Sequence, residues 1–292
     1  MAERSSVARP RRSALYVPAS NARAIDKARR LPCDAVILDL EDAVAPESKP
    51  AARDAAVAAI RAGGFGRREL VLRVNAVDTE WGVADLVAAL DSGADAVLVP
   101  KVRSATDVLN YDAALGDAPD TLRLWAMVET AISVFRLEEI AAAAAQTRLE
   151  CLVIGSNDLA KEMRMTLDVQ RAPLAAVLGL SVAAARAHGL AVLDGVYNAF
   201  DDDAGFATQC QQGADWGFDG KTLIHPRQVE PCNAAFSPSP AELERARRVV
   251  EAFALPTNAG RGALSVDGTM VERLHLAQAE RLLALDATIR GS

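Results

Sequence analysis

Acidic residues that follow short apolar segments of the chain are the first candidates for chemistry. Glu129 follows one such segment, and Asp158 lies just beyond the next. Two carboxylates suit a hard cation such as Mg²⁺, which leaves its remaining coordination positions to water and substrate oxygens. The alternative is that these acids cap helices or pair with Arg73 and Lys101. The spacing leaves both interpretations open.

Arg73 ends another apolar segment, and Asp39, Glu41 and Asp42 follow a fourth one. A planar guanidinium suits a carboxylate or a developing enolate oxygen, so we predict a catalytic role for Arg73. The alternative is a structural ion pair with Asp39 or Glu41. One of the three acids could orient Arg73 and another could act as a base with a raised pKa. We name Glu41 as a catalytic candidate, although spacing does not distinguish among the three.

Two basic residues, Arg23 and Lys27, lie on the first predicted helix, close to the strand that precedes it. Backbone N–H groups at a helix start attract phosphate, and basic side chains beside them strengthen that attraction. We therefore predict that Arg23 and Lys27 bind phosphate groups of a ligand. A solvated basic face is the alternative.

The elements that position these residues alternate between short apolar runs and longer alanine-rich stretches, which is typical of parallel strands buried on both faces and joined by helices. Strands are predicted at Ala14–Val17, Ala35–Leu38, Leu70–Val74, Ala96–Val99, Leu122–Met127, Cys151–Ile154, Ala191–Leu193 and Trp216–Phe218. Helices are predicted at Asn21–Arg30, Glu47–Ala62, Trp81–Asp91, Ser104–Leu115, Val134–Ala144, Pro173–His188, Asp203–Gln212 and Pro226–Ala235. Eight such units predict an α/β fold, a (β/α)₈ TIM barrel whose strand ends share one rim. A doubly wound sheet has the same alternation, but no GxGxxG follows the first strand.

The segment Ser237-Pro238-Ser239-Pro240 ends this pattern. We therefore predict a catalytic barrel domain at residues 1–236 and a helical extension at residues 237–292. Between its two amphipathic helices, the second of which is expected to include Val271, the extension has a loop rich in small residues, Thr257 to Thr269. A flexible loop that carries one acid, Asp267, suits a mobile lid. The alternative is an ordinary surface turn formed by Asp267-Gly268.

Composition and charge exclude several classes of protein. The 292 residues are 51% apolar, which excludes a disordered chain, and carry 32 basic and 39 acidic residues. The resulting net charge of −7 makes a nucleic-acid partner improbable. No apolar run reaches about 18 residues and no apolar region suits a secretory signal, so we expect no membrane span and a cytoplasmic location. The four cysteines form no CxxC pair, which disfavours zinc sites and disulfides.

Short motifs spread over residues 12 to 275 resemble those of the citrate lyase β-subunit family, within the HpcH/HpaI aldolase/citrate lyase group. The family includes malyl-CoA, citramalyl-CoA and citryl-CoA lyases and a malyl-CoA thioesterase. The motifs are Arg12-Ser13-Ala14-Leu15-Tyr16-Val17-Pro18, Asp39-Leu40-Glu41-Asp42-Ala43-Val44, Arg73-Val74-Asn75, Pro100-Lys101, Glu129-Thr130, Gly155 with Asn157-Asp158-Leu159, Gly220-Lys221 with Ile224-His225-Pro226, and Ser265-Val266-Asp267-Gly268-Thr269-Met270-Val271.

This resemblance implies a Mg²⁺-dependent barrel enzyme that acts on acyl-CoA thioesters, commonly as a homotrimer or hexamer. Glu129 and Asp158 match the family's metal ligands, and Arg73 matches its substrate-binding arginine. Asp267 matches a catalytic acid on a lid that completes the site of a neighbouring subunit. The basic pair Arg23 and Lys27 falls where the family contacts CoA phosphates.

The resemblance further implies a carbon–carbon lyase that cleaves or forms a 3-hydroxyacyl-CoA, with acetyl-CoA and a 2-oxo acid as the other partners. The alternatives are a malyl-CoA-type thioesterase, a CoA-free aldolase, and a β subunit that works only inside a citrate lyase complex. The chain departs from the family pattern at Ser133, where relatives usually have glycine, and at Glu272-Arg273 after the lid motif.

Overall fold

The computed structural model describes residues 9–291, which form two compact units. The larger unit is Arg11–Phe236, and the smaller one contains residues 237–291 together with Arg9 and Pro10. The first eight residues of the predicted barrel domain lie outside the described part of the chain. Each unit has apolar packing of its own.

Eight parallel strands of the larger unit close into a barrel, because β1 pairs with both β2 and β8. The closed sheet confirms the predicted TIM barrel and excludes the doubly wound alternative. The strands are β1 (Ser13–Pro18), β2 (Ala35–Asp39), β3 (Glu69–Arg73), β4 (Ala96–Val99), β5 (Arg123–Val128), β6 (Leu149–Ile154), β7 (Ala191–Asp194) and β8 (Gly220–Leu223).

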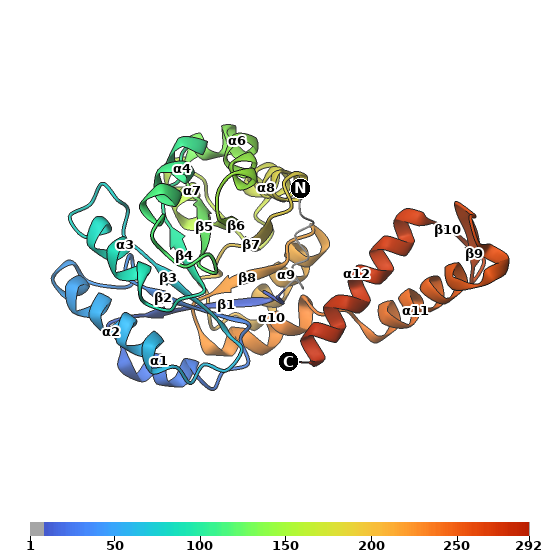
Figure 1. Cartoon of the computed structure of the whole chain (residues 1–292), viewed down its shortest axis with the longest axis horizontal. Helices are drawn as coiled ribbons and strands as arrows, with labels where there is room; N and C mark the ends of the chain where they lie inside the picture. Colours follow the sequence, from blue (N-terminus) through green and yellow to red (C-terminus); the bar gives the residue numbers. More distant parts are fainter. Residues whose placement is uncertain (1–8, 292) are drawn as a thin grey trace. The chain divides into compact units, whose positions relative to one another are not determined.

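Helices surround these strands on the outside of the barrel (Figure 1). They are α1 (Ala22–Ala28), α2 (Lys49–Ala62), α3 (Gly82–Leu90), α4 (Ala105–Ala114), α5 (Ala131–Phe135), α6 (Leu137–Ala142), α7 (Ser156–Glu162), α8 (Ala175–Ala187), α9 (Asp203–Asp215) and α10 (Val229–Ala235). Strand side chains alternate between two apolar cores. Ile37, Leu98 and Trp125 belong to the core inside the barrel, whereas Leu38 and Val97 belong to the larger core under the helices.

Two sequence predictions in the barrel are corrected by the structure. The eighth strand is Gly220–Leu223, whereas the predicted segment, Trp216–Phe218, is the turn that ends α9. This strand is hard to recognise because it carries Lys221, a fully buried lysine whose ammonium lies 2.8 Å from Asp194 Oδ2. The short helix α7 after β6 was not predicted, and the predicted helix Val134–Ala144 is divided at Arg136 into α5 and α6.

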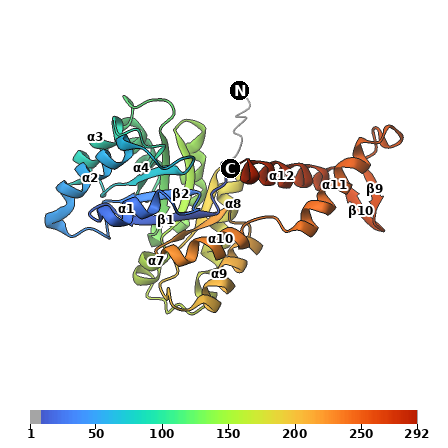
Figure 2. The same ribbon diagram turned by 90° about the horizontal axis from the view of Figure 1, so that it is seen from below.

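The smaller unit consists of two helices and a hairpin. Helices α11 (Pro240–Ala254) and α12 (Arg273–Arg290) lie alongside each other, with strands β9 (Ala263–Val266) and β10 (Thr269–Glu272) at one end of the pair (Figure 2). The expected loop Thr257 to Thr269 is therefore partly a strand, and Val271 belongs to β10 rather than to the last helix. Val271 and Leu264, from the two strands, pack with Phe253 of α11 in a small apolar core.

Two further expectations concern the described residues. No helix among residues 9–291 is long and apolar enough to cross a membrane. The four cysteines are buried and unpaired, as expected for structural thiols: Cys33, Cys151, Cys210 and Cys232.

Candidate active site

The C-terminal ends of β2 and β3 place one fixed ion pair at the rim of the barrel. Arg73 Nε and Nη2 donate to the two carboxylate oxygens of Asp39 at 2.7 and 2.6 Å. Asp39 also accepts from the backbone N–H groups of Glu41 and Ala43, at 2.8 and 3.2 Å. The Arg73 guanidinium lies over the Tyr16 ring, 4.7 Å from its centroid. This bidentate pair orients Arg73 so that its remaining nitrogen, Nη1, faces the other acids of the rim.

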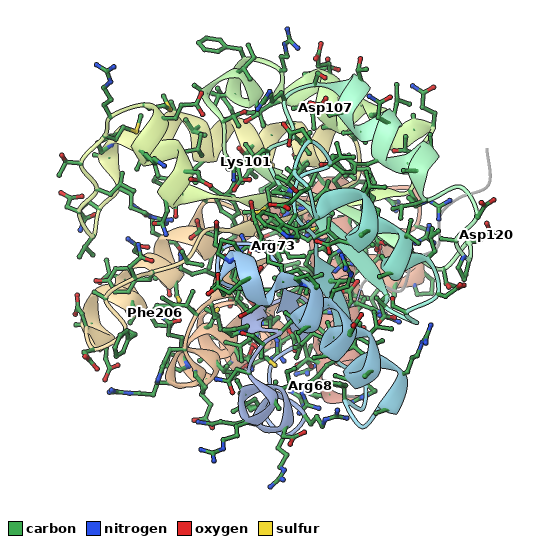
Figure 3. The ribbon with its side chains drawn as sticks, turned by 90° about the vertical axis from the view of Figure 1, so that its left-hand side faces the viewer. Arg68, Arg73, Lys101, Asp107, Asp120 and Phe206 are labelled. Atoms are coloured by element: carbon green, nitrogen blue, oxygen red, sulfur yellow. The ribbon has the colours of Figure 1, made fainter. Side chains whose placement is uncertain are left out.

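Glu41 connects Arg73 to Lys101, and Figure 3 labels these two basic residues toward the middle of its view. Its Oε1 lies 3.0 Å from Lys101 Nζ, and its Oε2 lies 2.9 Å from Arg73 Nη1. The second contact is an ion pair without hydrogen-bond geometry, so this buried oxygen has no hydrogen-bond partner among the described residues. Burial raises the pKa of Glu41 above its ordinary value. Glu41 therefore lies near two cations, and its Oε2 accepts no hydrogen bond from the described residues.

Lys101, directly after β4, connects the strand-end acids of the neighbouring strands. Its Nζ lies 3.5 Å from Asp158 Oδ2 and 3.9 Å from Glu129 Oε1, in addition to the Glu41 contact. Its backbone is left-handed, with φ of 53°, and its N–H donates to Glu129 Oε1 at 2.7 Å. A left-handed conformation at a non-glycine residue is uncommon and costs free energy. The strain is accompanied here by an N–H aimed at a buried carboxylate.

Glu129 is the most deeply buried of the three acids around Lys101, with 2% of its surface exposed. Burial, followed by the charge of Glu41, raises the pKa of Glu129 to about 8. Asp158 is more accessible, with 34% of its side chain exposed. The backbone of Gly155 passes directly beside Glu129, because a Cβ at Gly155 would stand 2.5 Å from Glu129 Oε2. Thus β5 and β6 bring the two predicted metal ligands around one point.

The local charge balance fits a divalent cation. Asp39 neutralises most of the Arg73 charge, which leaves three carboxylates, Glu41, Glu129 and Asp158, to share one ammonium at 3.0 to 3.9 Å. Within residues 9–291 no three acids, histidines or cysteines form a complete ligand set. Mg²⁺ needs only one or two protein carboxylates, however, since water and substrate oxygens supply the rest. The unused Glu41 oxygen and, once Glu129 has lost its proton, the excess negative charge both agree with such an ion.

A second buried lysine supports the loop that carries Glu41. Lys49 Nζ donates to the carbonyl oxygens of Leu40 and Glu41 at 2.9 and 2.7 Å, and to Asn75 Oδ1 at 2.7 Å. Asn75 in turn donates to Asp85 Oδ2 at 2.6 Å. The loop between β2 and α2 is therefore fixed by a buried network rather than left free to move.

Ser133, the position of an expected departure from the family pattern, has a structural role in this chain. It forms a capping box with Thr130, the residue after Glu129, and its hydroxyl donates to the Thr130 carbonyl at 2.6 Å. The extra hydroxyl thus fixes the turn that follows Glu129.

Arg23 and Lys27 lie together on α1, where they line a surface cavity of about 470 Å³ with Asp26, Arg30 and Leu31. Helix α1 has only seven residues, and its start is capped by Asn21, which accepts from Ala24 N–H at 3.1 Å. The basic side chains, rather than the helix start, are therefore what this segment offers to an anion. Neither side chain has a hydrogen bond or ion pair within the described chain.

Asp267 lies in the smaller unit, at the tip of the hairpin between β9 and β10. Asp267 and Gly268 have φ of 51° and 73°, as in a two-residue hairpin turn with left-handed central residues. The Asp267 carboxylate accepts from Arg248 Nε at 2.7 Å and is more than half exposed. The predicted acid is thus presented on a defined hairpin turn, as the surface-turn interpretation expects, and its role on a mobile lid stays a prediction.

Lys101 and Gly155 are the site residues that sequence reasoning undervalued. Both were visible at strand ends, in Pro100-Lys101 and in the glycine that follows β6. From the sequence, Lys101 is expected only as an ion-pair partner of the acids. The need for glycine at position 155 depends on Glu129, which lies 26 positions earlier in the chain. Arg73 forms ion pairs with both acids named in the structural alternative, Asp39 and Glu41, and the pair with Asp39 is the bidentate one.

Comparison with known proteins places this arrangement in context. The chain is 50% identical to a (3S)-malyl-CoA thioesterase of Cereibacter sphaeroides over 277 residues, 95% of each chain. It is 36% identical to citrate lyase subunit beta of Escherichia coli over 286 residues, 93% of this chain and 94% of the relative. Among solved structures, CitE of Mycobacterium tuberculosis in complex with magnesium, acetoacetate and coenzyme A matches with a TM-score of 0.74 and 32% identity, covering 94% of this chain and 97% of that one.

A model of one enzyme family, HpcH/HpaI aldolase/citrate lyase, matches residues 12–226. That range contains every barrel strand described above and the whole rim from Asp39 to Asp158. The relatives also extend over the smaller unit, because their matches cover more than nine-tenths of this chain. The resemblance inferred from short motifs is thereby confirmed: this chain belongs to the HpcH/HpaI aldolase/citrate lyase family.

Proposed function

We propose that this protein is a Mg²⁺-dependent enzyme that hydrolyses a CoA thioester of the malyl-CoA class to the free 3-hydroxy acid and CoA. The observation that carries the proposal is the convergence of Glu41, Glu129 and Asp158 beside the fixed guanidinium of Arg73. The 50% identity to a (3S)-malyl-CoA thioesterase supports hydrolysis as the reaction.

The proposed cation ligands are Glu129 and Asp158. When bound, Mg²⁺ would act as a Lewis acid that polarises substrate oxygens. Glu129, whose pKa burial raises to about 8, must lose its proton before it can bind the ion, and the Lys101 N–H keeps its Oε1 in place. The structures of CitE in complex with magnesium and either acetoacetate or pyruvate support this choice of ion.

Arg73 would bind the substrate's free carboxylate or the oxyanion that forms during reaction. Asp39 holds two of its nitrogens, so Nη1 needs no reorientation when negative charge develops near it. The contacts of Nη1 to Glu41 and Asp42, at 2.9 and 3.3 Å, are the ones that a substrate anion would replace. This one guanidinium would thus recognise the carboxylate that stays free when a dicarboxylic acid forms a thioester with CoA.

Glu41 would act as the base in hydrolysis. Its raised pKa and its unused Oε2 suit a carboxylate that takes a proton from water. The hydroxide oxygen then adds to the thioester carbonyl, and collapse of the tetrahedral oxyanion breaks the carbon–sulfur bond. The proton held by Glu41 passes to the departing CoA sulfur, which restores the carboxylate.

Arg23 and Lys27 would bind CoA phosphates. They lie on one helix beside Arg30, and neither is committed to an ion pair in the part of the chain described. This pair distinguishes an acyl-CoA enzyme from a CoA-free aldolase, which would not need it. We further propose a homo-oligomer, in which Asp267 serves the site of a neighbouring subunit, as the family resemblance implies.

Carbon–carbon cleavage is the second candidate, because citrate lyase β subunits are relatives and a related protein was solved with oxaloacetate and magnesium. In that reaction Glu41 would take the proton of the substrate hydroxyl, and the hydroxyl oxygen would become the carbonyl oxygen of the oxo acid as the bond between the two halves breaks. Asp267, in its protonated form, would give a proton to the acetyl carbon of the enolate that results. Arg73 would again face the developing oxyanion.

Product analysis separates the candidates. The purified chain with Mg²⁺ and malyl-CoA should yield malate and free CoA if it is a thioesterase, and glyoxylate and acetyl-CoA if it is a lyase. Mass spectrometry of both products, with citramalyl-CoA and citryl-CoA in parallel, also identifies the substrate. Inactivity of the pure chain on all three thioesters would favour the remaining alternative, a subunit that works only inside a larger lyase complex.

A further inference from the structure

Lys101 occupies an unusual position for a residue outside the proposed ligand set. Its ammonium is the one cation that touches all three carboxylates Glu41, Asp158 and Glu129, at 3.0, 3.5 and 3.9 Å, among the residues described. The Arg73 charge is largely used by Asp39, and Lys49 is bonded to backbone carbonyls and Asn75. In the metal-free chain, Lys101 therefore neutralises the charge that a divalent ion would otherwise neutralise.

The geometry points to Lys101 as an internal counter-cation that competes with the divalent ion and leaves the carboxylates when the ion binds. This inference rests on the proposed Mg²⁺ site. An ammonium and a divalent cation attract the same oxygens and repel each other, so both cannot keep short contacts to Glu129 and Asp158. Competition lowers affinity for the free ion but keeps the buried acids paired while the site is empty, because an unpaired buried charge is costly.

Lys101 also has space to move. Its side chain is 39% exposed, unlike the fully buried Lys221. It lines a cavity of about 250 Å³ between α3 and α4, whose wall includes the exposed acid Asp78 and the apolar residues Val77 and Leu86. Because the side chain is partly exposed and borders this cavity, rotation about its own bonds can carry a released ammonium into solvent.

The two functions of Lys101 are separable because they use different atoms. The backbone N–H holds Glu129 Oε1 at 2.7 Å and is retained in any non-proline variant. The side-chain Nζ supplies the charge. Lys101→Met removes only the charge and keeps an unbranched side chain on the left-handed backbone, whereas Lys101→Arg keeps the charge. Arg61→Met is the matched control, since it also removes one positive charge from an exposed side chain. Arg61 lies in the last turn of α2, and its guanidinium donates to the carbonyl of Asp91, which precedes β4.

The test is a titration of the substrate-free, full-length protein with Mn²⁺ at pH 9, followed by electron paramagnetic resonance of the free ion. We expect Lys101→Met to bind Mn²⁺ about tenfold or more tightly than the wild type, since a unit charge near a divalent ion is removed. Lys101→Arg and Arg61→Met should bind as the wild type does, and Glu129→Gln should lose the binding. Equal or weaker affinity of folded Lys101→Met, beside a wild type that binds, would overturn the competition while leaving the metal site intact. No Mn²⁺ binding by any form would overturn both.

A second measurement does not depend on the variant's folding. Wild-type protein is treated with an amine-acylating reagent with and without Mg²⁺, and modification of Lys101 is followed by peptide mass spectrometry. Release of the ammonium predicts that Mg²⁺ increases the labelling of Lys101 severalfold, whereas labelling of Lys161, an exposed lysine with no ion pair within residues 9–291, stays constant. Unchanged or reduced labelling of Lys101 at saturating Mg²⁺ would contradict its displacement.

Discussion

Replacing Gly155 by alanine should disable the site through Glu129 alone. Gly155 has φ of −94°, which any residue can adopt, so its backbone does not require glycine. A Cβ there would stand 2.5 Å from Glu129 Oε2 and also overlap Glu129 Cβ, whereas ordinary contact needs about 3.5 Å or more. Glu129 would have to move by roughly 1 Å, and a displacement of that size can cost about 10²-fold in rate. We therefore expect kcat/KM to fall about 10²-fold or more, with weaker Mn²⁺ binding.

The assay compares kcat/KM, Mn²⁺ affinity and urea denaturation of Gly155→Ala with those of Gly179→Ala, a change within α8 where a Cβ meets nothing within 4 Å. The control should keep full activity and gain up to about 1 kcal/mol in stability. Gly155→Ala, in which the added Cβ overpacks the site, should lose about 1–3 kcal/mol of its free energy of unfolding. If it acts through Glu129, adding it to Glu129→Gln should cost little further activity. Wild-type turnover and cation affinity in Gly155→Ala would refute the role given to the observed Glu129 position.

Further predictions concern Glu129, Arg73, the pair Arg23 and Lys27, and Asp267. Because burial raises the pKa of Glu129 to about 8, Mn²⁺ affinity should rise with pH up to about 8 and then level off. The free energy of unfolding of the metal-free protein should fall between about pH 4.3 and 8, since the folded state keeps a proton on Glu129 that the unfolded chain loses. Mn²⁺ affinity and the free energy of unfolding are both measured across this pH range, with Glu129→Gln as the control. Arg73→Lys should lower kcat/KM about 10²-fold or more in steady-state assays, because an ammonium cannot replace the two-pronged pair with its orienting carboxylate. Replacing Arg23 and Lys27 together by alanine should raise KM for the CoA thioester with kcat retained, and an unchanged KM would place the phosphates elsewhere. Asp267→Asn should fold and bind Mn²⁺ normally. If the chain cleaves the carbon–carbon bond and Asp267 acts in the site of a neighbouring subunit, mixed oligomers of Asp267→Asn and Glu129→Ala should regain that activity. Inactive mixed oligomers of verified composition would contradict a role of Asp267 in a neighbouring subunit.

The barrel was predictable because the sequence carries two signals for its strands: a run of apolar residues, and the polar residues that follow the run. Arg73, Glu129 and Asp158 were found for the second reason, since parallel strands place their ends on one rim whatever the loops do. The eighth strand escaped prediction because Lys221 makes it look polar. Its charge is compensated by Asp194, a residue of the neighbouring strand, and periodicity along one segment does not report such pairing.

The relation among the acids was not predictable from spacing, since Asp39, Glu41 and Asp42 lie within four positions and are chemically alike. The structure separates them by surroundings: Asp39 is buried against Arg73, Glu41 lies between Arg73 and Lys101, and Asp42 is largely exposed. The hairpin that carries Asp267 was missed for a related reason. Its strands have only four residues each: β9 lies in the segment rich in small residues that predicts a loop, and Val271 of β10 lies three positions before Leu274, a spacing that also fits the last helix.

The two proposed reactions, hydrolysis and carbon–carbon cleavage, would need the same electrostatic support from this rim. In each, negative charge would develop on a substrate oxygen near Arg73, and a cation bound by Glu129 and Asp158 would hold the substrate. The reactions differ in where a proton is taken or returned: at water for hydrolysis, at the acetyl carbon for cleavage. Glu41 is built into the barrel beside Arg73, whereas Asp267 belongs to the other compact unit and pairs there with Arg248. The choice of reaction therefore depends on whether Asp267 also reaches the substrate, since only Glu41 is positioned by the barrel itself.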